Sequence, residues 1–551
     1  MRRFSATFLA IASILTAACA QARPVEAQPA TAKPSNVVNG VLRAGGGPAT
    51  GAPTLLVFIT IDQFRGDYLA RYDAQLTGGL RRLVSGGAVF ANGFQDHGIT
   101  ETAPGHAATM SGRFPVHTGI VMNSQGVNTR DFPLLFGSNG PGAAPFRFVG
   151  TTLTDWLVAR DKRTRVLSVS RKDRGAILPI GRSKQSVFWY SSDGEFTTST
   201  WYAETLPQWV VLFNGAQAPQ KAAGREWNLL RPPADYPEPD SVPIESRGRD
   251  FVFPHVLPAD SSAAAANFVA YPWMDSLTLA FALRGLEAMK LGTGPQVDLL
   301  NISLSTTDAI GHRFGPDSRE LHDQILRVDR YLGAFLDSLF RVRDSTRIVI
   351  ALTGDHGISP IPGIHRYDPN QNGRVVSLDS LSERMRAGLQ AASLQPAKAA
   401  SFDDGVLVID RAYLRGTRVN ADSLVDWFAA QARKVPGVWR ADRMRDLAKM
   451  DTVSDDIARR WLHMFEPLNT NVALVVTTEK WSVWNLGGTA QHGSPHDNDA
   501  SVPVLFWGPM FRTRHLPDLV RVVDMAPTLA EALGVKPLEQ LDGVVLKRAF
   551  R

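Results

Sequence analysis

The sequence predicts an α/β fold in which helices flank both faces of a mostly parallel central sheet. From residue 55 onward, short segments of β-branched and apolar residues alternate with amphipathic helical patterns. Acidic residues and histidines follow directly after several of the strand segments. In such sheets the functional site collects at the carboxyl ends of the strands, so this placement supports the same fold.

The individual elements follow in order along the chain. Apolar runs with β-branched residues predict strands, and longer patterns with helical spacing predict helices between them. The strand segments are residues 55–62, 165–170, 296–305, 347–353, 472–478 and 502–508. The clearest helical segments are residues 274–290 and 318–340.

The chain of 551 residues is too long for one compact core of ordinary size. Two regions break the alternation: residues 191–265 are rich in aromatic residues and prolines, and residues 364–489 contain their own strand and helix patterns. We therefore expect residues 54–551 to form one large domain with two insertions that cap or border the site. The formal charge of +6 is modest, and no block of five basic residues occurs. We expect no nucleic-acid partner.

The N-terminus resembles a secretory signal. Arg2 and Arg3 precede an apolar run at residues 8–18, and Ala18-Cys19-Ala20 offers a small-x-small cleavage site. We predict a signal peptide at residues 1–20, followed by a flexible linker at 21–53 that is rich in Ala, Pro and Gly. The protein would be exported, to the periplasm or beyond.

Lipoprotein processing at Cys19 is the alternative, but Thr16 stands where a branched apolar residue is usual. Cleavage after Ala20 would remove the only cysteine and leave no disulfide. No later stretch has the roughly 18 apolar residues that a membrane span needs, so we expect no internal span.

Two strand segments end in an acid and a histidine. Residues 296–305 lead into Asp308 and His312, and residues 347–353 lead into Asp355 and His356. Carboxylate and imidazole are ligands that zinc prefers. Two such ends predict two metals in one site, a common arrangement for phosphoryl transfer.

Further ligands are available at two places. Asp62 ends the strand segment 55–62, although an Asp there also serves as a turn or cap residue. His492 and His496 precede the strand segment 502–508, and one of them is a candidate last ligand while the other would be a loop histidine.

A hydroxyl nucleophile is available at Thr102. Pro104 suits the first turn of a helix, which places Thr102 at or near the N-cap. Thr is a good N-cap residue without any catalytic role. Beside a metal, however, a hydroxyl at a helix N-terminus would have its alkoxide stabilised by dipole and cation together.

A basic pair follows the strand segment 165–170. Lys172 and Arg174 are two positions apart, so on an extended segment they point to the same side. They could bind phosphate oxygens, the Arg as a fork and the Lys as a point charge. The alternative is a basic turn with Asp173 as its partner.

Together these segments resemble the alkaline phosphatase superfamily of two-zinc phosphoryl-transfer enzymes, and most closely its PafA-type (phosphate-irrepressible) alkaline phosphatases. The resemblance spans roughly residues 55–545. It rests on the motifs IDQFRGDYL, TETAPGHAATMSG, SRKDRGAILPIG, STTDAIGHRFGP, TGDHG, QHGSPHDND and VVDMAPTLAEALG.

The resemblance implies a site in which one zinc is held by three residues and the other by a second three. The first set would be Asp308, His312 and His492. The second set would be Asp62, Asp355 and His356, with Thr102 as the nucleophile beside that zinc. His496 stands where the family would have an aromatic residue.

The resemblance also implies a function: hydrolysis of phosphate monoesters through a phosphothreonine intermediate. Lys172 and Arg174 would bind the non-transferred oxygens, and Asn123 would add a hydrogen bond. The Lys-x-Arg pair is typical of the monoesterase branch. The segment between Asn123 and Lys172 is shorter than expected of the family, so the entrance of the site would be reshaped.

Alternatives remain. The first is a phosphodiesterase or nucleotide pyrophosphatase of the same superfamily, which shares the ligands and the Thr. A sulfatase is disfavoured because Thr102 is followed by Ala-Pro-Gly-His and not by a sulfatase motif. The remote alternative is a periplasmic metal- or phosphate-binding protein without activity. The sequence leaves the oligomeric state open, a monomer included.

Overall fold

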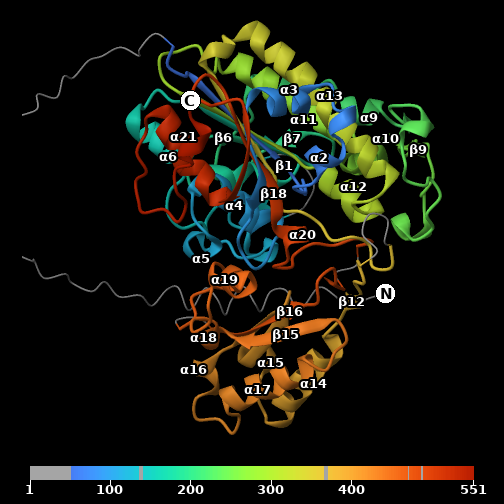
Figure 1. The fold of residues 1–551 in the computed structure, drawn as a ribbon, viewed down its shortest axis with the longest axis vertical. Helices are drawn as coiled ribbons and strands as arrows, with labels where there is room; N and C mark the ends of the chain where they lie inside the picture. The colour runs from blue at the N-terminus through green and yellow to red at the C-terminus, as the bar shows by residue number, and fades with distance from the viewer. Residues whose placement is uncertain (1–50, 136–140, 365–369, 469–470, 486–487) are drawn as a thin grey trace, which may run out of the picture.

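A nine-stranded sheet forms the centre of the molecule (Figure 1). The structure is a computed structural model that describes residues 51–135, 141–364, 370–468, 471–485 and 488–551. In spatial order the strands are β19 (Arg514–Arg521), β2 (Ala88–Phe94), β18 (Ser501–Trp507), β11 (Ile348–Thr353), β1 (Leu55–Ile61), β10 (Asp298–Leu304), β5 (Val166–Ser170), β6 (Ser186–Tyr190) and β7 (Phe196–Thr197).

The middle of this sheet is parallel. β1 pairs in parallel with β10 and β11, β10 with β5, and β5 with β6, whereas β18 runs antiparallel to β11 and β2. In register, Thr60 of β1 lies opposite Thr353 of β11 and Ser303 of β10. The carboxyl ends of β1, β10 and β11 therefore lie at one edge of the sheet.

Two hydrophobic cores cover the two faces, because successive side chains of a strand point to opposite sides. Val57 and Ile59 of β1 face one core, with α3 (Gly79–Gly86), α11 (Trp273–Ala288) and α13 (Arg319–Val342). Leu56 and Phe58 face the other, with α4 (Thr102–Ser111), α6 (Leu153–Arg160) and α21 (Met525–Leu533). The predicted fold class, a mostly parallel sheet with helices on both faces, is confirmed.

A second sheet lies outside this body, at the bottom of Figure 1. It is antiparallel, with the order β13 (Ala400–Asp403), β14 (Val406–Ile409), β16 (Val472–Thr478) and β15 (Val438–Arg443). Helices α14 (Asp379–Ala391) and α17 (Ala421–Ala432) pack against it. The strand expected at 472–478 is present, but it belongs to this second sheet. A buried apolar run predicts a strand without indicating which sheet the strand joins.

The aromatic-rich region after β6 contains only short elements: α8 (Gln208–Asn214), α9 (Ala218–Lys221), β8 (Glu226–Trp227), β9 (His255–Val256) and α10 (Ser261–Asn267). They extend the core beside α13, where the Trp227 indole donates to Asp323 at 2.7 Å. The boundaries 191–265 and 364–489 for two insertions remain an interpretation of this arrangement.

Most predicted elements are present within one or two residues. Four strands of the central sheet were not predicted: β2, β6, β7 and β19. Asn92 and Gly93 interrupt β2, and Pro517 stands in β19, which is an edge strand. The predicted signal peptide and nearly all of the predicted linker lie outside the described residues. Among the helices of the described part, none is long and apolar enough to cross a membrane.

Candidate two-metal active site

The acids and histidines predicted as ligands gather at the carboxyl edge of the parallel strands. Asp62 follows β1, Asp355 and His356 follow β11, and α12 (Thr306–Phe314) begins after β10 and carries Asp308 and His312. The three strands are neighbours and end in register, so these side chains meet.

Three of the predicted ligands form a first group: Asp308, His312 and His492. Nε2 of His312 lies 3.2 Å from Oδ1 of Asp308 and 3.2 Å from Nε2 of His492, which is 3.7 Å from the same oxygen. Both rings place Nδ1 against a backbone carbonyl, that of Ala490 at 2.8 Å and that of Thr100 at 2.7 Å. A hydrogen on Nδ1 leaves the Nε2 lone pair for a metal.

The second predicted group is Asp62, Asp355 and His356. Nε2 of His356 lies 3.5 Å from Oδ1 of Asp62 and 3.5 Å from Oδ2 of Asp355, while Nδ1 contacts the carbonyl of Gly357 at 2.9 Å. The rings of His356 and His492 stack with centroids 3.7 Å apart, so the two groups adjoin. The ligand atoms of Asp308, His356 and His492 also lie within 4.8 Å of one another.

The carboxylates of the second group fit a divalent cation. Both oxygens of Asp62 and Oδ2 of Asp355 are buried and accept no hydrogen bond among the described residues, although Oδ2 of Asp62 lies 2.7 Å from Nζ of Lys172 and Oδ2 of Asp355 lies 3.0 Å from Nδ1 of His106. Buried carboxylates that accept no hydrogen bond are costly, and such groups are normally paired with cations or bound to a metal. The donor set of carboxylate oxygens and imidazole nitrogens matches zinc.

The charges of the site interact strongly. Burial, and then repulsion from Asp308 and Asp355, raise the pKa of Asp62. Burial also opposes ionisation of Asp308, but the Lys172 ammonium and His312 outweigh it and hold the pKa of Asp308 well below its usual range. Lys172 thus supplies positive charge to a site that the carboxylates make strongly negative.

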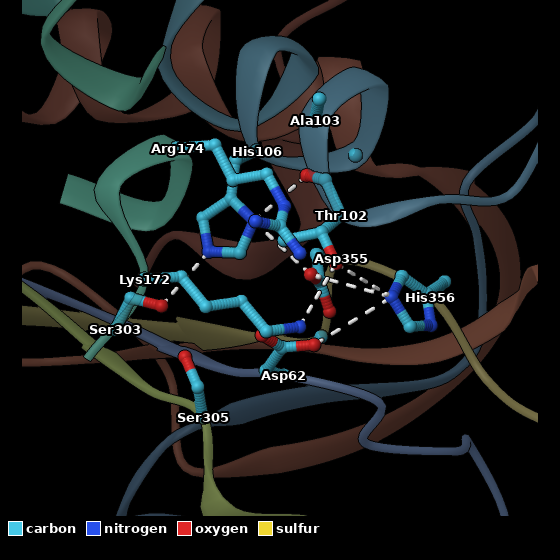
Figure 2. Close-up of polar contacts among 12 residues, drawn as sticks. Asp62, Thr102, Ala103, His106, Lys172, Arg174, Ser303, Ser305, Asp355 and His356 are labelled. Carbon is cyan, nitrogen blue, oxygen red and sulfur yellow. Dashed lines mark hydrogen bonds and ion pairs between the residues drawn. The ribbon is translucent and has the colours of Figure 1, made fainter. Parts of the chain in front are cut away.

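Thr102 begins α4, and its hydroxyl points toward Lys172 and His356 (Figure 2). Its Oγ1 lies 3.0 Å from Nζ of Lys172 and 3.4 Å from Nε2 of His356. The side chain is fully buried. The N-cap residue is Glu101, so Thr102 is the first helical residue, and Pro104 stands in the first turn as expected.

The basic pair is positioned by a turn and not by an extended segment. Lys172 is the N-cap of α7 (Asp173–Ile177), and Arg174 lies inside this short helix. The expected geometry, two residues apart on one side of a strand, is therefore wrong, because the chain turns into the helix directly after β5. Figure 2 shows both side chains extending from this turn toward Thr102. Arg174 also keeps its predicted neighbour Asp173, with 3.6 Å between Nη1 and Oδ1.

Asn123 lies beside the nucleophile candidate. Its Oδ1 accepts a hydrogen bond from the Ala103 N–H at 2.9 Å, and its own N–H donates to Glu101 at 2.6 Å. Asn123 is thereby fixed to the residues on either side of Thr102. With the carbonyl oxygen used, the Nδ2 hydrogens remain as donors.

His496 takes no part in the site. Its Nε2 contacts the backbone carbonyl of Thr478 at 2.8 Å, and its ring packs beside Trp439. The choice of His492 over His496 agrees with this geometry.

Two supporting residues were not predicted from the sequence. His106 lies one helical turn after Thr102, with Nδ1 2.9 Å from the Thr102 carbonyl and 3.0 Å from Oδ2 of Asp355, and Nε2 2.9 Å from Ser303 (Figure 2). Gln63 directly follows Asp62 and contacts two of the acids. The spacing of four on a helix could have indicated His106, but nothing in the sequence pattern marks Gln63.

Comparison with known proteins places this chain among phosphoric ester hydrolases. Residues 56–464 match the family model described as type I phosphodiesterase / nucleotide pyrophosphatase. Alkaline phosphatase PhoV of Synechococcus elongatus is 30% identical over 88% of this chain and 90% of its own. Alkaline phosphatase PhoK of a Sphingomonas species is 31% identical over 89% of this chain and 90% of its own.

The crystal structure of alkaline phosphatase PafA is also similar, with a TM-score of 0.84 and 25% identity over 91% of this chain and 99% of that one. A second PafA structure, with a TM-score of 0.82, carries substitutions at a threonine, an asparagine, a lysine and an arginine. There the threonine and asparagine are 21 positions apart, as are Thr102 and Asn123, and the lysine and arginine are two apart, as are Lys172 and Arg174. Between asparagine and lysine the separation is 62 positions there and 49 here, which agrees with the expected shorter segment.

Proposed function

The chain belongs to the type I phosphodiesterase / nucleotide pyrophosphatase family, and from this premise we propose that it is an exported alkaline phosphatase that uses Thr102 to hydrolyse phosphate monoesters. As a member of this family, with alkaline phosphatases among its relatives, it is a phosphoric ester hydrolase. The finer assignment concerns the nucleophile, the metals and the choice of ester.

One observation carries the proposal: the Thr102 hydroxyl lies between Lys172 at 3.0 Å and His356 at 3.4 Å, at the start of a ten-residue helix. An ammonium within hydrogen-bond distance and the positive end of a helix dipole both favour the deprotonated hydroxyl. These contacts support Thr102 as a nucleophile over a simple capping role.

Two zinc ions are the proposed cofactors. Asp308, His312 and His492 would hold one, and Asp62, Asp355 and His356 would hold the other, with Thr102 beside it. When bound, the metals would lower the pKa of the nucleophile and offset charge on the leaving oxygen. The six proposed ligand side chains include three carboxylates, and two divalent cations would outweigh the charge of these carboxylates in favour of an anionic substrate.

The reaction proceeds in two displacements. Oγ1 of Thr102 loses its proton and forms a bond to phosphorus while the ester P–O bond breaks, and the alcohol leaves with a proton. The product is phosphothreonine at residue 102. Water then attacks phosphorus on the opposite side, the P–Oγ1 bond breaks, and inorganic phosphate and the Thr102 hydroxyl are released.

Lys172, Arg174 and Asn123 would stabilise the non-transferred oxygens. A monoester carries more charge on these oxygens than a diester, which presents a second organic group instead. A lysine and an arginine at this place therefore favour a monoester. The spacing that these residues share with the substituted positions of PafA supports the same assignment.

Acid quenching during turnover of a radiolabelled monoester tests the proposal. We expect up to one labelled phosphate per chain, located on Thr102 by peptide mapping. Label on any other residue, or monoester turnover without acid-stable label when the second step is slowed, would exclude the phosphothreonine route.

A phosphodiesterase is the second candidate, because the matching family model is described by phosphodiesterase and nucleotide pyrophosphatase activities. The same site would then accept a second organic group. Relative turnover of the two ester classes separates the candidates.

Export is part of the proposal and rests on the signal-like residues 1–20. N-terminal sequencing of the mature protein from a bacterial host would show cleavage after Ala20. A mature chain that begins at a lipidated Cys19 would instead support anchoring.

A further inference from the structure

Gln63 contacts one acid from each ligand group. Its backbone N–H donates to Oδ1 of Asp355 at 2.9 Å, and its side-chain Nε2 donates to Oδ1 of Asp308 at 3.1 Å. The residue is completely buried. Since Asp62 precedes it in the chain, Gln63 connects three carboxylates that lie beyond the carboxyl ends of three different strands, β1, β10 and β11.

Each of these two hydrogen bonds selects an orientation of a carboxylate. In Asp355, Oδ1 is taken by the Gln63 N–H, which leaves Oδ2 to face His356 at 3.5 Å and His106 at 3.0 Å. In Asp308, Oδ1 accepts from Gln63 and faces His312, while Oδ2 lies 2.7 Å from Lys172. Gln63 thus determines which oxygen of Asp355 and which oxygen of Asp308 faces the histidines.

The backbone at Gln63 is held in an unusual conformation. Its φ is +63°, in the left-handed region where residues other than glycine are uncommon. Such strain persists where the surrounding structure enforces it, and it is concentrated at functional sites. This conformation turns the N–H toward Asp355.

Gly311 of α12 leaves room for the Gln63 side chain. A Cβ at residue 311 would lie 1.8 Å from Oε1 of Gln63, far below any contact distance. Glycine is disfavoured inside helices, so its place here, three residues after Asp308, is explained by the close approach of the amide. The positive φ of Gln63 and the glycine at 311 both allow Gln63 to approach the acids closely.

We propose that Gln63 is a positioning residue that couples the two metal-ligand groups by fixing the carboxylates of Asp308 and Asp355. The inference rests on the two-metal centre of the proposed function. Partners that orient metal ligands typically change metal affinity about 10- to 100-fold when removed. Substitution leaves the backbone N–H in place, so only the Asp308 contact is lost. The two metals should therefore respond unequally.

The test is a zinc titration of the full metal-free chain, with competing chelator, for wild type, Gln63→Ala, Gln63→Gly and Gln63→Glu. We expect all three variants to bind the zinc of the Asp308 group about 10- to 100-fold more weakly. The affinity for the zinc of the Asp62 group should be nearly unchanged. Gln63→Gly separates positioning from stability: glycine suits the positive φ, so its metal-free Tm should equal or exceed that of Gln63→Ala.

The matched control is Gln296→Ala. Gln296 is a buried glutamine that also donates to an aspartate, Asp298, but at the opposite end of β10. The Gln296→Ala variant should have a changed Tm, but its two zinc affinities should equal those of the wild type. Unchanged zinc binding in the Gln63 variants, or equal weakening of both sites in step with Tm, would overturn the role of Gln63. A wild-type chain that binds fewer than two zinc ions would overturn the two-metal centre itself, and the inference with it.

Discussion

The ammonium of Lys172 lies 3.0 Å from the hydroxyl oxygen of Thr102. The same nitrogen is 2.7 Å from Asp62 and 2.7 Å from Asp308, so a single cation contacts the nucleophile candidate and one acid of each ligand group. This arrangement ties the charge balance of the proposed metal centre to the hydroxyl that is proposed to react.

Thr102→Ala should lower monoester kcat by about 10⁴-fold or more, as expected for loss of a nucleophile. It should still bind two zinc ions, because the six Asp and His side chains are unchanged. Steady-state kinetics and metal analysis of the same preparation check both parts. Thr102→Ser, which keeps a hydroxyl, serves as the control and should retain measurable turnover. Full activity in the alanine variant would remove Thr102 from the mechanism.

Removal of metal should abolish activity and destabilise the protein. The carboxylates of Asp62, Asp308 and Asp355 are buried and repel one another, and bound metal stabilises the folded state by mass action. We expect Tm to fall by several degrees after chelation and to recover, together with activity, on addition of zinc. Differential scanning calorimetry and an ester assay measure the two effects. Activity that survives exhaustive chelation would contradict the metal assignment.

Gly105→Ala should disrupt the site through packing alone. A Cβ at residue 105 would lie 2.1 Å from the carbonyl oxygen of Asp355, so α4 and the end of β11 must separate. Overpacking of this kind costs about 1–3 kcal/mol, and the shift moves Thr102 away from His356. The matched control is Gly388→Ala in α14, where nothing lies within 4 Å.

The control should raise stability by up to about 1 kcal/mol, the helix propensity difference between Gly and Ala. Urea denaturation and kcat for both variants provide the comparison. Wild-type activity in Gly105→Ala would show that the close approach of α4 to Asp355 is not needed for catalysis.

The ion pairs of Asp96 lead us to expect that the free energy of unfolding decreases in acid. This buried carboxylate pairs with Arg459 at 3.0 Å, Arg460 at 3.2 Å and Arg521 at 2.8 Å, and so connects α19 (Asp456–Leu462) to the central sheet. Burial opposes ionisation of Asp96, but Arg459, Arg460 and His463 outweigh burial and hold the pKa of Asp96 well below its usual range.

Because the folded-state pKa is lowered, the stabilisation is complete above the ordinary Asp pKa of about 3.9 and is lost as pH falls below that value. Asp96→Asn should cost about 2–4 kcal/mol at pH 7, with Arg521 contributing least because it is partly exposed. The difference from wild type should shrink below about pH 4. Unfolding curves across pH 3–7 test this, and a constant difference would contradict it.

The fold class and the ligand types could be predicted from the sequence because both depend on local patterns. β1, β10 and β11 are rich in apolar and β-branched residues, and an Asp follows each of them within four residues: Asp62, Asp308 and Asp355. By contrast, the strand at 472–478 joined a second sheet, since its pairing partners β14 and β15 are not encoded in its own residues.

The supporting residues of the site were harder to predict for the same reason. Gln63 matters through contacts with Asp355 and Asp308, which are 292 and 245 positions away. The pair of Lys172 and Arg174 was recognised by type and spacing, yet its geometry depends on where β5 ends and α7 begins. Side-chain contacts across strands become visible only once the strands are placed.

The comparison of a phosphate monoester with a matched diester tests the central claim most directly. Wild type should have the higher kcat/KM for the monoester, such as p-nitrophenyl phosphate over bis(p-nitrophenyl) phosphate. Lys172→Ala/Arg174→Ala should lose about 10³-fold or more on the monoester, since each contact to developing charge is worth about 10²–10³. The double variant should lose less on the diester, because the contact of Lys172 with Thr102 serves both esters, whereas the contacts to the additional charge serve the monoester alone. The exposed Lys162→Ala is the control. A wild-type preference for the diester, or monoesterase activity retained by the double variant, would contradict the account.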